Sequence, residues 1–205
     1  MTAIAITGGI GAGKSQVFSI LKKRGYPVLD ADVIAAEAVL LPEIQNAIVG
    51  HFGSDSYFPN GQYNRKYIRD VVFSSPQKRL FLESLLHPKI SQLFSEKKHS
   101  LEMISPGAWL FYEAALIFEA GRQNSFDAVV LVRAPLEVRL DRLQNLRGLD
   151  RAQAQKIMAS QWDDSQKSIL AQYVLENNST PLELEIQTSQ LVQKLSERFY
   201  PSPGL

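Results

Sequence analysis

Short apolar runs alternate along the chain with longer stretches in which apolar residues recur at helical spacing. The runs are brief and almost continuously apolar, as expected of strands that are buried on both faces of a parallel sheet. This alternation predicts an α/β fold in three layers, a five-stranded parallel sheet with helices on both faces. The expected strands are Ala3–Thr7, Tyr26–Asp30, Ala108–Glu113, Ala128–Ala134 and Gln172–Asn177.

The expected helices are distributed unevenly between these strands. After the first strand, apolar residues recur at helical spacing. Residues 136–147 and 151–162 are also expected to form helices, with charged outer faces. A long segment of helical pattern, from about 33 to 106, separates the second and third strands and carries a turn signal at Pro59-Asn60-Gly61. We expect one domain over residues 1–205, with a core (about 1–32 and 107–205), a helical insertion (about 33–106) and a lid (about 138–152).

Composition narrows the classes of function. The chain has 205 residues, of which 45% are hydrophobic, so it can bury a sizeable core. Its 22 basic and 21 acidic residues give a net charge of +1, without long blocks of one sign, so we expect neither a nucleic-acid partner nor a membrane surface. Cysteine is absent, which excludes disulfides and thiolate chemistry. With neither signal peptide nor transmembrane span evident, the expected location is cytoplasmic.

A glycine-rich stretch after the first expected strand carries the most specific chemistry. Residues 6–15 read "ITGGIGAGKS" and match G-x-x-x-x-G-K-[ST] with Gly8, Gly13, Lys14 and Ser15. Backbone N–H groups of such a loop and the following helix N-terminus bind phosphates. Lys14 is expected to reach the β- and γ-phosphates, and the Ser15 hydroxyl is expected to be a ligand of Mg²⁺. The sequence therefore predicts a nucleoside triphosphate site.

The remaining motifs favour a kinase over a nucleotide-dependent switch. A guanine-nucleotide switch would offer D-x-x-G and N-K-x-D segments, and neither occurs in this sequence. A kinase needs an acidic group at the acceptor hydroxyl and arginines that close over the phosphates. Asp30 and Asp32 lie at the C-terminal end of the second expected strand, where ligands of open α/β sheets bind. The structural alternative makes Asp30 a turn residue and Asp32 the N-cap of the following helix.

Several strings in this order resemble the dephospho-CoA kinase family, whose members phosphorylate the ribose 3′-hydroxyl of dephospho-coenzyme A with ATP. "TGGIGAGKS", "VLDADVIA", "HFG", "NGQYNR" and "LLHPKI" are similar to the first half of that family. "YEAALIFE", "VRLDRLQNLR" and "AQYVLENN" are similar to its later segments, so the resemblance runs nearly end to end. It implies the last step of coenzyme A biosynthesis, with ATP and Mg²⁺ as cofactors and a helical insertion that binds the CoA substrate.

The resemblance also implies roles for individual residues. Asp32 falls on the family's general base, and Lys14 and Arg142 are the other expected catalytic residues. Arg142 and Arg147 lie in the expected lid. The residues expected to bind ATP are Gly9, Gly11, Ala12, Gly13, Lys14, Ser15, Gln16, Arg142 and Asn177. Those expected to bind the substrate are Asp32, Arg65, His87 and Glu119, and those expected to bind the metal are Ser15 and, through water, Glu113.

Some of these residues also have simpler interpretations. Glu113 is equally an acid at the end of a strand. The spacing of His87 beside Pro88 favours a packed or capping histidine, and only the resemblance makes it a substrate-side candidate. Arg65 and Arg69 lie four residues apart and are equally a solvated helix face.

The chain departs from the family pattern in several places: Ala36 replaces an Arg or His, Ala115 a proline, and Gln172 an aspartate. The lid also has one extra residue between Arg142 and Arg147. None of them removes an expected catalytic group, although the loss of a cation at Ala36 bears on substrate affinity. Two alternatives stay open, another small P-loop kinase acting on a nucleoside or nucleotide hydroxyl, and a paralogue that binds nucleotide without turnover. The expected assembly is a monomer or a weak homo-oligomer.

Overall fold

The structure is a computed structural model that describes residues 1–200, apart from the side chain of Arg147. It contains two compact units. The core unit comprises Met1–Val28 and the chain from Ser105 onward, and the helical unit comprises Leu29–Ile104. The helical unit contains almost all of the segment that the sequence predicts as an insertion.

The core unit is built on a five-stranded sheet with the order β2-β3-β1-β4-β5. Strand β1 pairs in parallel with β3 and β4, and β4 pairs in parallel with β5. The backbone N–H of Phe111 donates to the carbonyl of Pro27, just before β2. All five expected strands are present, with ends moved by one or two residues: β1 Thr2–Thr7, β2 Val28–Asp30, β3 Trp109–Glu113, β4 Ala128–Arg133 and β5 Tyr173–Glu176.

Alternation along the strands explains why both faces of this sheet are apolar. Side chains of successive strand residues point to opposite faces, so Ile4 and Ile6 share one face while Ala3 and Ala5 share the other. All four are fully buried, as the sequence of a doubly covered strand requires. The face of Ile4 and Ile6 packs with residues of α1 and α9, among them Val17, Leu21, Leu184, Leu191 and Leu195.

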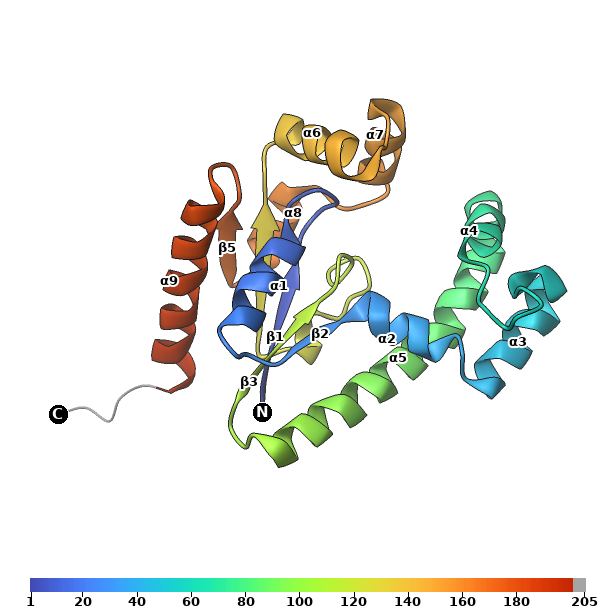
Figure 1. Cartoon of the computed structure of the whole chain (residues 1–205), viewed down its shortest axis with the longest axis horizontal. Helices are drawn as coiled ribbons and strands as arrows, with labels where there is room; N and C mark the ends of the chain where they lie inside the picture. Colours follow the sequence, from blue (N-terminus) through green and yellow to red (C-terminus); the bar gives the residue numbers. More distant parts are fainter. Residues whose placement is uncertain (201–205) are drawn as a thin grey trace. The chain divides into compact units, whose positions relative to one another are not determined.

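The helices of the core unit differ from the expected ones at one place. The helix expected over 151–162 ends at Ala159, because Asp163 begins a new helix by accepting a hydrogen bond from Ser165 N in a capping box. Figure 1 shows α6 and α7 beyond the end of the sheet toward which the strand arrows point. The helices are α1 Lys14–Lys23, α6 Leu136–Arg147, α7 Arg151–Ala159, α8 Asp164–Leu170 and α9 Pro181–Phe199, with a 3₁₀ turn η2 Gln123–Ser125.

The helical unit has its own small core. Ile44, Ile48, Phe52 and Ile68 are buried together, and the Tyr57 hydroxyl donates to the Val39 carbonyl at 2.6 Å. Within the described residues no single helix is long and apolar enough to cross a membrane; α2 and α3 reach that length only together and are bent by 80°. The elements are α2 Ala31–Ala38, α3 Pro42–Phe52, η1 Ser54–Ser56, α4 Arg65–Ser74 and α5 Pro76–Ile104.

Candidate active site

The glycine-rich stretch forms a compact loop between β1 and α1. Inside it, Ala12 N donates to the Gly9 carbonyl at 3.1 Å, and Gln16 N donates to the Gly13 carbonyl at 3.0 Å. Gly13 is the N-cap of α1 and supplies no side-chain cap, so the first N–H groups of the helix are open to an anion. The Lys14 ammonium donates to the Gly8 carbonyl at 2.8 Å and thus lies over the loop.

Asn177, which follows β5, packs directly against this loop. Its side chain is buried, and its Nδ2 donates to the Ala12 carbonyl at 2.9 Å and to Gln16 Oε1 at 3.1 Å. A Cβ on Gly13 would lie 2.0 Å from the same Nδ2, and Gly13 has a φ of +97°. A side chain at Gly13 would therefore separate Asn177 from the loop.

Arg142 on α6 joins the loop and Asn177. Its Nη1 lies 3.4 Å from the carbonyls of Gly11 and Ala12. Its Nη2 donates to the Asn177 carbonyl at 3.2 Å and to Asn177 Oδ1 at 3.1 Å. Burial lowers the pKa of Arg142 below its usual range, and a guanidinium is still charged at neutral pH. Residues expected to bind ATP thus converge from three segments that are distant in sequence.

On the acceptor side, the two aspartates of "DAD" have different roles. Asp30 is the N-cap of α2 and accepts a hydrogen bond from the backbone N–H of Asp32 at 2.7 Å. The alternative in which Asp32 caps this helix is therefore wrong, because Asp30 occupies the N-cap position and its side chain accepts the hydrogen bond of the cap. Asp32 lies in the first turn of α2 with an exposed side chain.

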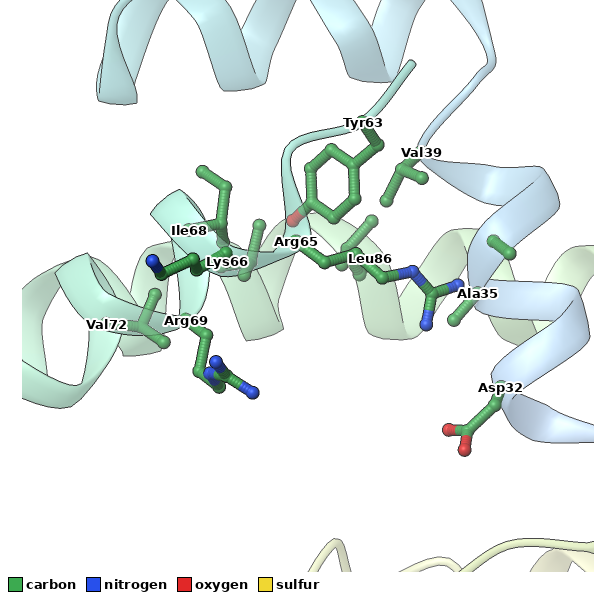
Figure 2. Close-up of a pocket in the computed structure, with 12 residues that line it drawn as sticks. Asp32, Ala35, Val39, Tyr63, Arg65, Lys66, Ile68, Arg69, Val72 and Leu86 are labelled. Atoms are coloured by element: carbon green, nitrogen blue, oxygen red, sulfur yellow. The ribbon is translucent and has the colours of Figure 1, made fainter. Parts of the chain in front are cut away.

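Asp32 lines a pocket of about 600 Å³ within the helical unit. Figure 2 shows Arg65 extending from α4 toward α2, where the Asp32 carboxylate borders the same hollow. Ala36, where the family has a cation, lines this pocket too, so its small side chain leaves room there. The other lining residues are two further cations and an apolar wall: Lys66, Arg69, Ala35, Val39, Tyr63, Ile68, Val72, Leu82 and Leu86.

Two of the other departures from the family pattern have structural contacts in the core unit. The Ala115 carbonyl accepts a hydrogen bond from the Thr7 hydroxyl at 3.1 Å, just before the loop. Gln172 Oε1 accepts from Val129 N at 2.7 Å, beside the start of β5. Neither of these hydrogen bonds involves Arg142 or Asn177, so the two departures leave the contacts of those residues in place.

The remaining expected site residues occupy varied positions. His87 is exposed on α5 next to Leu86, but it is not among the described residues that line the pocket. Glu113 is half-buried at the carboxyl end of β3, in register with Ile6 of β1. Glu119 Oε1 lies 2.8 Å from the ammonium of the buried Lys167. The lid role expected for Arg147 concerns a side chain outside the described part of the structure.

Two residues that the sequence did not point to also contact the phosphate loop. Arg139 on α6 donates to the Ile10 carbonyl, and Gln161 after α7 accepts from the Ile10 N–H. Arg139 lies three residues before Arg142, so the helical spacing could have placed both on one face. Nothing in the local sequence marks Gln161.

The fold and this loop define the class of protein, an ATP-dependent P-loop kinase. The model of the family described as "Dephospho-CoA kinase" matches residues 2–183. The chain therefore belongs to the dephospho-CoA kinase family.

The chain is similar over nearly its whole length to known proteins and solved structures. A dephospho-CoA kinase of Geobacter metallireducens is 35% identical over 199 residues, which cover 97% of this chain and 98% of that protein. A solved Thermus thermophilus structure has a TM-score of 0.82 at 31% identity, covering 95% of this chain and 97% of that one. The dephospho-CoA kinase of Campylobacter jejuni, at 24% identity, shares the fold with a TM-score of 0.71, covering 96% of this chain and 98% of that one.

Proposed function

We propose that this chain transfers the γ-phosphoryl group of ATP to the ribose 3′-hydroxyl of dephospho-CoA, giving coenzyme A and ADP in the last step of coenzyme A biosynthesis. The observation that carries the choice of acceptor is the pocket of the helical unit. Among the described residues that line it, Asp32 is the one carboxylate, and it lies with three cations and an apolar wall. A long anionic acceptor with a reactive hydroxyl needs each of these features.

The ATP phosphates would be bound by the loop from Gly9 to Gln16. Backbone N–H groups and the positive end of α1 favour the negative charge, and Lys14 would exchange its carbonyl contacts for the β- and γ-phosphates. Arg142 and Asn177 already contact this loop through backbone carbonyls. In the catalytic role proposed for it, Arg142 exchanges one of these contacts for a phosphate oxygen.

The donor set of the core unit suits a magnesium ion. Ser15 lies in the first turn of α1, and Glu113 ends the strand next to β1, so both belong to the carboxyl edge of the sheet. A hydroxyl and a carboxylate are hard oxygen donors, of the kind that Mg²⁺ prefers. Ser15 would bind the ion directly and Glu113 through water. When bound, the ion neutralises charge that develops on the phosphates.

Asp32 would act as the general base. A carboxylate is a weak base in the ground state. Phosphoryl transfer passes through a loose transition state in most analyses, so the hydroxyl loses its proton late. The carboxylate then serves mainly to orient the hydroxyl and to accept its proton during transfer.

The cations of the pocket would bind the pyrophosphate of the acceptor. Arg65 presents a planar guanidinium, which suits phosphate oxygens, and Lys66 and Arg69 add charge on the same helix. The apolar wall would contact the uncharged arm of the substrate. Substrate roles for His87 and Glu119 stay predictions, and for Glu119 the role competes with its ion pair to Lys167.

A coupled assay of ADP release from MgATP tests this proposal, with dephospho-CoA as the acceptor. Mass spectrometry of the product should show one added phosphate, and phosphorus NMR should place it on the 3′-oxygen. Turnover only with nucleosides or nucleotides would indicate another small P-loop kinase. Binding of ATP without turnover of any acceptor would indicate a non-catalytic paralogue. The monomeric or weakly associated state and the cytoplasmic location stay predictions.

A further inference from the structure

Ile10, in the middle of the phosphate loop, is held at both polar groups of its backbone. Its N–H donates to Gln161 Oε1 at 2.8 Å, and its carbonyl accepts from Arg139 Nε at 2.9 Å. Its side chain packs against the apolar cluster of α6 and α7, which contains Leu140 and Leu143. Ile10 is thus fixed by residues that are remote in sequence.

The position of Arg139 is itself closely determined. Its side chain is only 12% exposed, and its Nη1 lies 3.3 Å from Asp164 Oδ2 at the start of α8. Its Nη2 lies over the backbone of Gly9, where a Cβ would come within 2.2 Å of it. The guanidinium therefore fills space that only a glycine at position 9 leaves open.

The turn that carries Gln161 is anchored as well. Trp162 N donates to Glu119 Oε1 at 3.0 Å, and the ammonium of Lys167 lies 2.8 Å from the same oxygen. The Lys167 side chain is fully buried, so this ion pair is shielded from solvent. Glu119 thereby holds the connection between α7 and α8, and with it the amide of Gln161.

We propose that Arg139 and Gln161 are positioning residues that clamp the Ile10 peptide and hold the phosphate loop in its ATP-binding conformation before ATP arrives. A loop that is already ordered does not lose conformational entropy when its ligand binds. The clamp contacts the loop rather than the transferring group, so it favours the bound ground state and the transition state alike. Its loss therefore weakens ATP binding and leaves the rate of transfer nearly unchanged. The inference rests on the proposed use of ATP by this site.

The main test uses Arg139→Gln and Gln161→Ala, with Arg151→Gln as the control. Arg151 is on the neighbouring α7, where it pairs with Glu137 on the surface. Calorimetry of ATP binding without acceptor should show about a tenfold rise in Kd for either variant, the effect of roughly one lost hydrogen bond. In steady state, kcat and the KM for dephospho-CoA should stay within about twofold of the parent. Arg151→Gln should match the parent throughout.

The double variant shows whether the two residues act on one peptide. Its effect on the Kd for ATP should be smaller than the product of the single effects, since the first loss already frees Ile10. An unchanged Kd in both single variants would overturn the clamp. So would a large fall in kcat at constant Kd, which would make Arg139 a ligand of the transferring phosphoryl group. Failure of the parent itself to bind ATP would instead refute the proposed function.

Gly9→Ala supplies a readout that a purely structural role would not move. The new methyl group would displace the guanidinium of Arg139 rather than backbone atoms, so it should raise the Kd for ATP as Arg139→Gln does. In the Arg139→Gln background, where the guanidinium is gone, the same substitution should have little further effect. An equal loss in both backgrounds would contradict the clamp.

Discussion

Asp30 caps α2 by accepting a hydrogen bond from the backbone of Asp32 at 2.7 Å, and this contact separates the roles of the two aspartates. The Asp30 carboxylate forms its hydrogen bond with the N-terminus of the helix. The exposed carboxylate of Asp32, in the first turn of the same helix, borders the pocket. The geometry thus supports Asp32 as the group that acts on the acceptor, and Asp30 as the residue that begins the helix bearing it.

Asp32→Asn should lower kcat by on the order of 10²- to 10⁴-fold, because the amide keeps the shape but loses the charge that accepts the proton. The Kd for ATP, measured by calorimetry, should hardly change. Asp30→Ser keeps a capping oxygen and should retain most activity, whereas Asp30→Ala should lower the free energy of unfolding by about 1 kcal/mol. A fully active Asp32→Asn beside an inactive Asp30→Ser would reverse the assignment.

Lys14→Ala should abolish transfer while the fold stays intact. In the structure the ammonium donates to the Gly8 carbonyl at 2.8 Å, within the phosphate loop. The substitution removes the cation expected at the β- and γ-phosphates, so kcat/KM should fall by much more than tenfold. Circular dichroism spectra and melting temperatures of the two proteins serve as the control. Activity within tenfold of the parent would refute the assignment of Lys14 to the transferring phosphate.

Arg142→Ala should lower kcat and kcat/KM together, by roughly 10²-fold, as expected of a donor that stabilises charge in the transition state. Arg142→Lys keeps the charge but cannot reach Gly11, Ala12 and Asn177 with one planar fork, so it should rescue only part of the rate. Initial rates at varied ATP separate the two parameters. A change confined to the KM for ATP would make Arg142 a ground-state anchor.

Lys167→Met should destabilise the fold strongly. The substitution leaves the Glu119 carboxylate, which is 13% exposed, without its cation, and breaking a buried pair in this way costs about 3–5 kcal/mol. Lys167→Met with Glu119→Gln removes both charges and should recover part of the loss. Urea unfolding followed by circular dichroism measures each free energy. Arg151→Ala, which breaks a solvent-exposed pair, should leave the unfolding free energy nearly unchanged.

Tyr63, in the wall of the pocket, should contribute to alkaline unfolding. Burial, reinforced by the nearby Tyr57, raises the pKa of Tyr63 to about 12. In the unfolded chain the hydroxyl of this tyrosine ionises near pH 10. The stabilisation that comes from keeping Tyr63 neutral is therefore complete below pH 10 and is lost as the pH rises toward 12. Tyr63→Phe should therefore flatten the fall in unfolding free energy between about pH 10 and 11. Parallel curves for parent and variant across this range would contradict the effect.

The sequence alone determined the features that reside in one continuous stretch of chain. The five strands were evident because each contains a short, mostly apolar run, and burial of the central strands β1, β3 and β4 on both faces imposes that pattern. The phosphate loop was evident because its glycines, lysine and serine are neighbours in the chain. The family resemblance rested on such local strings too, and the match over residues 2–183 confirmed it.

Only the tertiary structure decided which polar groups meet. Asp30 and Asp32 are equally good capping residues by type, and the actual path of the chain gave the cap to Asp30. Arg139 and Gln161 both form hydrogen bonds with Ile10, although they lie 129 and 151 residues from it in the sequence. Glu119 finds Lys167 in the interior, although its string suggested a substrate ligand. Side-chain hydrogen bonds between distant segments leave no periodic signal in the sequence, because they depend on where packing brings the segments rather than on local conformational preference.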